Sequence, residues 1–246
     1  PPVGTTEQRP ENPQEGDLRF NTDIGSLEYF KGNGLGWEQI QMSEAASIAG
    51  RGLFLGGHAP AAANVIDYIT IQSTGNAKDF GDLTKNSAVG GGLGSSTRAV
   101  HGGGYTGSAN TNIIDFGEFA TLGNFADFGD LVTDRHWVQS GCNQVRGLFA
   151  TGHGSPSLQN VIEYITISQT GNGTDFGDLT VTRNNLAGCS NGTRGVFGGG
   201  YLGPGSNPTY YNTLDYITIS STGNATDFGD LTQAREGPGS SSNGTR

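Results

Sequence analysis

Four copies of one pattern occupy most of this 246-residue chain. Aligned on an arginine that precedes a short apolar run, the copies span residues 51–97, 98–145, 146–193 and 194–245, and each contains the letters DFGDL. A repeat of 40–50 residues is typical of propellers and solenoids, in which every unit packs on its neighbours. The chain is therefore predicted to be an array of four similar units of about 48 residues.

Each unit has the pattern of short strands and none of helices. The stretch VIEYITIS in the third copy is rich in β-branched and aromatic residues, as strands are. Tyr164, Thr166 and Ser168 are expected to share one face of this strand. The isoleucines are assigned to a second face, which is expected to be buried: Ile162, Ile165 and Ile167. TGN predicts a turn, DFGDLT a third short strand, and the Gly/Ser/Asn-rich tail of each copy a fourth strand in a crowded position near an axis.

Composition excludes several classes of protein. The chain has 13 Lys and Arg against 23 Asp and Glu, a net charge of −10, which argues against binding to a phosphate backbone. No apolar run approaches the roughly 20 residues of a membrane helix, so we expect no membrane insertion. About half of the acids recur at template positions, so the net charge says little about a partner. The 43 glycines are explained by the tight turns and close strands of four copies.

Residues 1–42 do not fit the repeat and are predicted to form a separate module, followed by a repeat domain over residues 43–246. Two alternating stretches, Asp17–Asn21 and Ser26–Phe30, predict a β-hairpin around Thr22–Gly25. Trp37 is the natural cover for that small sheet. A lone hairpin is marginal in water, so the module should dock on the repeats or on a partner chain.

The repeats resemble kelch repeats. Double glycines end the apolar strand in three copies (Gly56-Gly57, Gly102-Gly103, Gly198-Gly199), whereas Thr151 interrupts the pair in the third. An aromatic follows in the next strand (Tyr68, Phe116, Tyr164, Tyr216), and phenylalanine stands where kelch repeats usually have tryptophan (Phe80, Phe128, Phe176, Phe228). The resemblance implies an all-β, kelch-like β-propeller with four blade-like units. An oligomeric β-fibre built from the same repeats is the alternative.

The first module resembles one found in fibre and virion proteins of tailed phages, through the run Arg9–Thr22, the triplet Leu27-Glu28-Tyr29, and Trp37. The repeats also resemble those of marine-phage structural proteins. These resemblances imply a virion component in the tail or fibre region, not an enzyme, with other virion proteins, copies of itself and a host-surface glycan as partners. Two alternatives stay open: a secreted kelch-type enzyme that acts on carbohydrate, and a capsid-decorating protein without a ligand.

One position of the repeat predicts a binding rim. The residue after the glycine run is aromatic or histidine in every copy, and the loops that follow it vary, which suits a variable rim on a fixed scaffold. Sugar or peptide contact is the functional interpretation, and packing beside a turn is the alternative. The rim candidates are His58, Tyr105, His153 and Tyr201, with Tyr210 and Tyr211 from the fourth loop.

The recurring charges are interpreted as structural. The arginines that open the copies are expected to lock neighbouring units through a carboxylate: Arg51, Arg98, Arg146 and Arg194. The aspartates of DFGDL are expected to accept backbone N–H groups or to meet those arginines: Asp79, Asp127, Asp175 and Asp227. The Asp-x-x-Asp spacing is not that of an EF-hand, so no metal or cofactor is predicted, and no catalytic set recurs. Cys142 and Cys189 are expected to be two buried thiols, too far apart for a disulfide.

Overall fold

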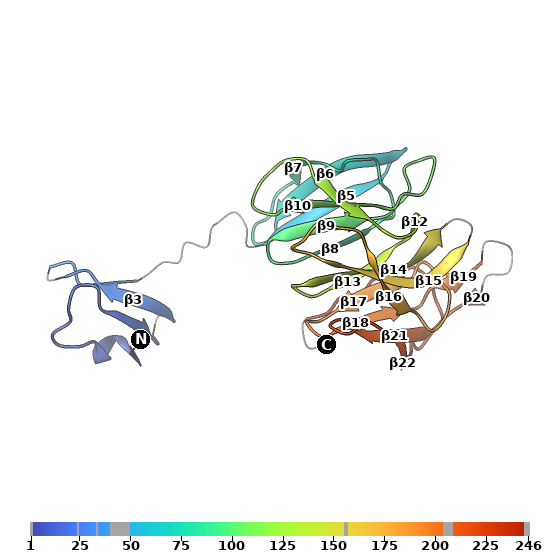
Figure 1. Ribbon diagram of the computed structural model, residues 1–246. Helices are drawn as coiled ribbons and strands as arrows, with labels where there is room; N and C mark the ends of the chain where they lie inside the picture. The colour runs from blue at the N-terminus through green and yellow to red at the C-terminus, as the bar shows by residue number, and fades with distance from the viewer. Residues whose placement is uncertain are drawn as a thin grey trace. The chain divides into compact units, whose positions relative to one another are not determined.

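A computed structural model describes residues 2–39 except 24 and 33, together with residues 50–154, 157–203 and 209–243 (Figure 1). The chain divides into two compact units, Pro1–Ala49 and Gly50–Arg246. The predicted boundary at residues 42 and 43 lies outside the described residues. Every described residue belongs to a strand, a turn, a loop or one short 3-10 turn at Thr6–Gln8. In this described part, no helix is long and apolar enough to cross a membrane.

The first unit is a four-stranded sheet in the order β1-β2-β3-β4. The predicted hairpin is present, since β2 (Leu18–Asn21) pairs antiparallel with β3 (Ser26–Phe30). Two very short strands extend it: β1 (Val3–Gly4) runs parallel to β2, and β4 (Trp37–Gln39) pairs with β3. Trp37 lies against Phe30 with ring centroids 5.5 Å apart, and so covers the sheet as expected.

A buried carboxylate holds this small sheet together. Glu28 is almost fully buried and forms ion pairs with Arg9 at 2.5 Å and with Arg19 at 3.2 Å. Asn21 donates a further hydrogen bond of 3.2 Å to the same carboxylate. The hydrogen bond from Arg9 is the main cause that lowers the pKa of Glu28, against the opposing effect of burial. The ion pair between Arg9 and Glu28 thus holds the segment that precedes β2 against β3.

The second unit contains four repeat sheets, numbered here in chain order (Figure 1). The first is β5-β6-β7, the second β8-β9-β10-β11, the third β13-β14-β15-β16 with β12 beside β14, and the fourth β17-β18-β21-β22. Their bounds are β5 Arg51–His58, β6 Ala62–Thr70, β7 Lys78–Asp82, β8 Gly91–Gly94, β9 Arg98–Gly102, β10 Ile113–Glu118, β11 Ala126–Asp130, β12 Arg135–His136, β13 Gln139–Cys142, β14 Arg146–Gly154, β15 Leu158–Thr166, β16 Thr174–Asp178, β17 Ala187–Ser190, β18 Arg194–Gly198, β21 Thr213–Thr218 and β22 Thr226–Asp230. A two-stranded ribbon, β19 (Tyr201–Leu202) with β20 (Thr209–Tyr210), leaves the fourth sheet.

The glycine-rich tail of a sequence copy belongs to the sheet of the next copy. The tails form the short strands β8, β13 and β17, and each pairs with the first strand of the copy that follows. These small-residue strands lie next to one another, because Ser140 on β13 bonds to Gly92 on β8 and Ser190 on β17 bonds to Cys142 on β13. The expected fourth strand is therefore present, and it links consecutive copies.

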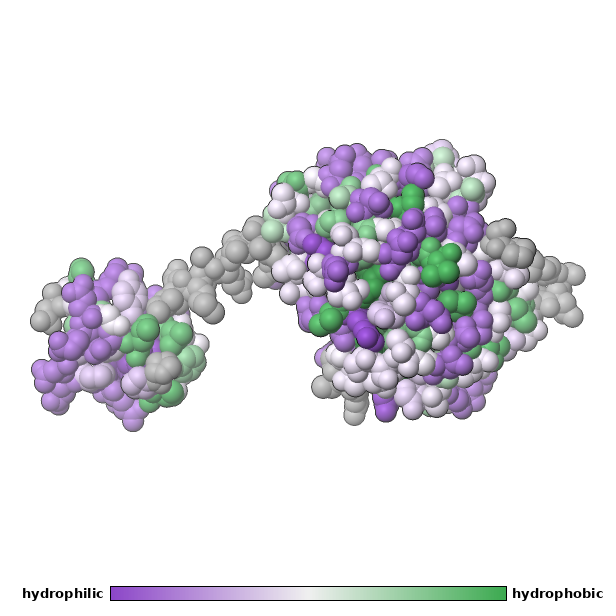
Figure 2. Space-filling model, viewed as in Figure 1, coloured by the Kyte–Doolittle hydropathy of each residue, from purple (hydrophilic) through white to green (hydrophobic). Residues whose placement is uncertain are grey.

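Both faces of each inner sheet are buried, which corrects the expectation of a single buried isoleucine face. Ile165 and Ile167 pack in a cluster with Val100 and Phe128 of the second sheet. Ile162 lies instead on the face of Tyr164, in a cluster with Phe197 of the fourth sheet. Successive side chains alternate, so residues 162 and 164 share a face and residue 165 does not. In Figure 2 the visible face of the repeat unit carries its hydrophobic residues in several separate patches between hydrophilic ones.

Three of the four arginines that open the copies bridge neighbouring sheets, but to a carbonyl instead of a carboxylate. Arg98 Nη1 donates to Ile167 O at 2.9 Å, and Arg146 Nη1 to Ile219 O at 3.0 Å, each in the following sheet. Arg51 reaches Phe119 O in the same way. Each guanidinium also lies over the aromatic ring of its own sheet, at 4.4–5.0 Å. Arg194 has this ring contact, and no hydrogen bond of its side chain occurs in the described residues.

The carboxylates at the sheet junctions pair with a second set of arginines that sequence analysis missed. Arg135 forms a fully buried ion pair with Glu163 at 2.8 Å, and Arg183 one with Asp215 at 3.0 Å. Burial raises the pKa of Glu163, and the charge of Arg135 opposes that shift. At the junction of the first and second sheets, Ser87 takes the arginine position.

The DFGDL aspartates lie on the surface: Asp79, Asp127, Asp175 and Asp227 are exposed. Asp175 and Asp227 accept the N–H of the glycine two residues later, at 3.2 and 3.0 Å, which is one of the two expected roles. None of the four meets an arginine in the described part of the chain. Both cysteines are free thiols, as predicted, but they are half-buried and not fully buried.

Thr151 occupies a backbone position that the other copies give to glycine. Its φ is +57°, and the equivalent Gly56, Gly103 and Gly199 have φ of +62°, +68° and +72°. A β-branched residue is strained in this left-handed region by about 1–2 kcal/mol. The Thr151 hydroxyl is also buried with no hydrogen-bond partner among the described residues. The third copy therefore carries a local strain that the other three avoid.

We expect Thr151→Gly to raise the free energy of unfolding by about 1 kcal/mol. Relief of the left-handed strain and removal of the unsatisfied hydroxyl outweigh the greater flexibility of glycine in the unfolded chain. Urea denaturation measures the change. Thr151→Ser keeps both the strain and the hydroxyl and should give no gain, and a destabilised Thr151→Gly variant would contradict the expectation.

Candidate ligand-binding rim

Three of the predicted rim residues pair with the segment that enters their own sheet. Tyr105 forms a bridge with Ala88, His153 pairs with His136, and Tyr201 forms a bridge with Asn184. Because these pairs recur in the second, third and fourth sheets, side chains of neighbouring sheets are brought towards one another at one edge of the repeat unit. The backbone pairing explains why a residue after the glycine run lies at a rim.

One pocket of about 200 Å³ opens at this rim, between the third and fourth sheets. It is smaller than the roughly 300–1,000 Å³ of sites for drug-sized ligands. Its size suits a group comparable to one sugar ring or one amino-acid side chain. The lining residues are His136, Trp137, His153, Leu158, Asn184 and Tyr201.

Aromatic rings make up most of the pocket wall. His136 contacts Trp137 with ring centroids 4.5 Å apart and His153 at 5.2 Å. Trp137 meets His153 edge to face at 6.3 Å. Tyr105 of the second sheet extends the cluster, since its ring lies 5.9 Å from His136. A flat apolar group could therefore stack against a wall already built of rings.

Two polar atoms of the lining residues are buried and have no partner in the described structure: His153 Nδ1 and Asn184 Oδ1. Buried polar atoms are normally satisfied, so these two stand out as unpaired groups on residues beside the pocket. His136 is already fixed, because its Nδ1 lies 2.7 Å from Asn110 Oδ1. Burial, reinforced by the nearby His153, lowers the pKa of His136, and its ring is therefore neutral at neutral pH.

The structure brings together Tyr105, His153 and Tyr201 but not the other rim candidates. His58 is exposed on the first sheet, and its only pairing in the described residues is the backbone pairing with Ala62. Tyr210 pairs with Tyr201 across the ribbon, with ring centroids 6.4 Å apart, but it does not itself line the pocket. Tyr211 is half-buried, and its N–H donates to Gly200.

Sequence analysis missed the two residues at the centre of the pocket, His136 and Trp137. They occupy a dipeptide that is Ala-Val, His-Trp, Asn-Asn and Glu-Gly in successive copies. The variation of this dipeptide between otherwise constant segments is the sequence signal that could have identified it as part of a site. Trp137 has a φ of +56°, and the equivalent Val89, Asn185 and Gly237 also have positive φ. The left-handed conformation therefore belongs to the repeat backbone, and in one copy it places a tryptophan in the lining of the pocket.

No group of three or more His, Cys, Asp or Glu side chains that could hold a metal ion occurs in the described part of the chain. The lining of the pocket also contains no carboxylate. The arrangement can therefore stack a ring and exchange hydrogen bonds with it. It does not offer the pair of carboxylates that glycoside hydrolysis uses.

Comparison with known proteins gives little beyond the fold. No protein-family model matches the chain, and no curated protein matches it either. Among solved structures, one described as "Structure of YjhT" is similar, with a TM-score of 0.66 and 9% sequence identity over 88% of this chain and 81% of that chain. At this identity the likeness concerns the fold alone, and it agrees with an all-β protein built of multiple sheets.

Proposed function

We propose that this chain is a binding and assembly protein of a phage virion, in the tail or fibre region, and that the pocket at its rim binds one sugar ring of a host-surface glycan. The observation that carries the glycan part is the pocket itself. It joins an aromatic wall of His136, Trp137 and Tyr201 to two buried polar atoms that lack partners. Stacking on the apolar face of a sugar and hydrogen bonding to its hydroxyl groups are the two contacts that such a wall and such atoms supply.

The virion part of the proposal rests on resemblance. The run Arg9–Thr22 and the repeated DFGDL pattern resemble phage structural proteins. The repeat sheets are taken to be blades of a kelch-like propeller, with the short strands β8, β13 and β17 nearest the axis. The likeness to the structure described as "Structure of YjhT" supports an all-β arrangement of this kind. Mass spectrometry and immunogold labelling of purified particles test the location, and absence of the protein from particles would reject it.

Ligand-observed NMR with methyl glycosides of the common hexoses tests the pocket. At least one glycoside should bind, with a Kd in the millimolar range that corresponds to about −4 kcal/mol. Trp137→Gly removes the ring and gives the residue the backbone freedom of the equivalent Gly237, so the variant should fold and lose the binding. Tyr201→Ala should lose it as well.

Two control variants separate the pocket from general effects. Val89→Gly makes the same backbone change in a copy without the pocket, and His58→Ala removes a rim candidate far from the lining set. Both should bind like the parent protein. Unchanged binding in Trp137→Gly, or no binding to any glycoside, would show that the rim is not a sugar site.

A further inference from the structure

Every junction between repeat sheets is formed by the same pair of hydrogen bonds, which we call the junction lock. An asparagine of the turn in one sheet accepts the N–H of the last DFGDL aspartate in the sheet before it. The bonds run from Asp82 to Asn124 at 3.0 Å, from Asp130 to Asn172 at 3.1 Å and from Asp178 to Asn224 at 3.0 Å. Beside each bond, the phenylalanine carbonyl of DFGDL accepts an N–H from a glycine of the same turn: Phe80 from Gly123, Phe128 from Gly171 and Phe176 from Gly223. Three copies of one interface thus join four sheets.

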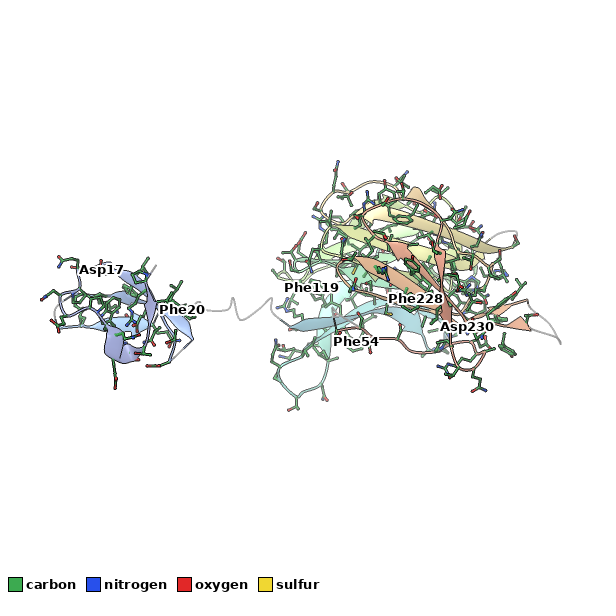
Figure 3. All side chains as sticks on the ribbon, turned by 90° about the horizontal axis from the view of Figure 1, so that it is seen from below. Asp17, Phe20, Phe54, Phe119, Phe228 and Asp230 are labelled. Atoms are coloured by element: carbon green, nitrogen blue, oxygen red, sulfur yellow. The ribbon has the colours of Figure 1, made fainter. Side chains whose placement is uncertain are left out.

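The fourth sheet presents its half of this lock, the N–H of Asp230 and the carbonyl of Phe228, to solvent. Phe228 is 51% exposed, whereas the equivalent Phe176 is 2% exposed. A Cβ added to Gly177 would lie 2.5 Å from Gly223, yet one added to Gly229 meets nothing within 4 Å. No acceptor side chain faces the N–H of Asp230 within the described ranges. Figure 3 labels Phe228 and Asp230 on this sheet.

The first sheet presents the other half, which is the turn with its asparagine and glycine. Its turn asparagine, Asn76, is exposed. Ile71 is 65% exposed and Phe54 is 57% exposed, whereas their equivalents Ile167 and Phe149 are at most 1% exposed. Phe54 is labelled on this sheet in Figure 3. The residues that are core at each inner junction are therefore surface here.

The buried ion pair is also split between the two ends. Arg235 is the equivalent of Arg135 and Arg183, but it is exposed, and its side chain has no partner in the part of the chain that is described. Asp67 is the equivalent of Glu163 and Asp215, and its carboxylate likewise lacks an arginine among those residues. Arg194 is likewise separated from its partner. The equivalent Arg98 and Arg146 donate to the carbonyls of Ile167 and Ile219 in the following sheet. The matching carbonyl for Arg194 is that of Ile71 in the first sheet. The two ends complement each other in charge, shape and hydrogen bonding.

The segment after Arg235 continues the row of small-residue strands. Ser240 Oγ donates to Gly188 O at 2.8 Å, and Ser242 Oγ donates to Ser190 O. Ser140 and Ser190 form the same kind of bond between the small-residue strands of earlier sheets. Residues 238–243 thus lie where the inner strand of a following sheet would lie. β5 pairs only with β6 among the described strands, so its other edge is available to such a strand.

We infer that a second copy of this chain binds head to tail, with the fourth sheet of one copy against the first sheet of the other. Arg235 of one copy would pair with Asp67 of the other, and Asn76 would accept the N–H of Asp230. The first and fourth sheets lie at opposite ends of the stack in Figure 1, and both contact faces are exposed in the single chain. Unlike patches meet in this contact, which makes the interface heterologous.

Analytical ultracentrifugation of the full chain from 1 to 100 µM tests the inference. The parent should sediment at twice the 25.5 kDa of one chain or more. Arg235→Glu and Asp67→Arg, each alone, should weaken association at least tenfold, and the two changes in one chain should restore part of it. Lys85→Glu makes the same change of charge at an exposed residue away from both faces and should leave the mass unchanged.

Hydrogen exchange on the same samples identifies the occupant. Protection of residues 71–76 and 226–230 that rises with concentration supports a second copy. A monomer with both segments unprotected overturns the inference, and so does a monomer that protects both, because it closes on itself. The pocket plays no part in this contact, so loss of sugar binding with association intact would reject the proposed function alone.

Discussion

Replacing Arg135 by methionine is expected to lower the free energy of unfolding by about 3–5 kcal/mol. The guanidinium is fully buried and pairs with Glu163 at 2.8 Å. Its removal leaves a carboxylate without a countercharge at the junction of the second and third sheets, and that group then takes up a proton. Urea denaturation followed by circular dichroism measures the loss.

The repeat supplies a matched control for this change. Arg235→Met alters the equivalent residue where it is exposed, and in dilute protein it should shift stability by no more than about 0.5 kcal/mol. The double variant Arg135→Met with Glu163→Leu removes both charges and should recover most of the stability. Equal effects of Arg135→Met and Arg235→Met would show that the buried pair does not stabilise the junction.

Gly177→Ala is expected to lower the free energy of unfolding by about 2–6 kcal/mol. The added Cβ would lie 2.5 Å from the carbonyl of Gly223 in the next sheet, and the backbone φ of +140° strains any residue with a side chain. Overpacking and strain each cost about 1–3 kcal/mol. Denaturant titration of Gly177→Ala measures the sum, and spectra of the folded protein show whether the sheets still pack.

Gly229→Ala separates the two effects. This glycine has a φ of +129°, but its added Cβ would meet nothing within 4 Å. Only the strain remains, so the dilute monomer should lose about 1–3 kcal/mol less stability than with Gly177→Ala. If both variants lose the same amount, close approach of the sheets is not what requires glycine at this position.

Much of the fold follows from the repeat. The period, the DFGDL strand and the glycine-rich tail predict short strands in the right places, because the same local pattern occurs four times. The packing of both sheet faces does not follow, since alternation alone leaves open what each face meets. Arg135 and Arg183 were not predicted, for a related reason. Ser87 stands at their position in one copy, so a position that is core in the fold does not repeat strictly in the sequence.

The rim was predicted in part. Tyr105, His153 and Tyr201 stand at a constant distance from the arginine that opens each copy, and backbone pairing places them at one edge. His136 and Trp137 belong to a different copy-dependent dipeptide, and only the fold shows that it lies beside them. A rim residue contributes to the pocket only where aromatic side chains lie next to it. Among the described residues, His58 has no aromatic ring contact.

Ser87 stands where the other two junctions have an arginine, so the junction of the first and second sheets lacks the buried ion pair. Here Asp115 has no arginine; it accepts the N–H and hydroxyl of Thr84, at 3.1 and 2.7 Å, and burial raises its pKa. His101 is buried beside Ser87, with a pKa lowered to about 4, and so is uncharged. In a linear array stability is a sum of units and interfaces, so partial unfolding begins where an interface is weakest. The array should therefore fray from its first sheet, with the two ion-paired junctions as the last part to come apart.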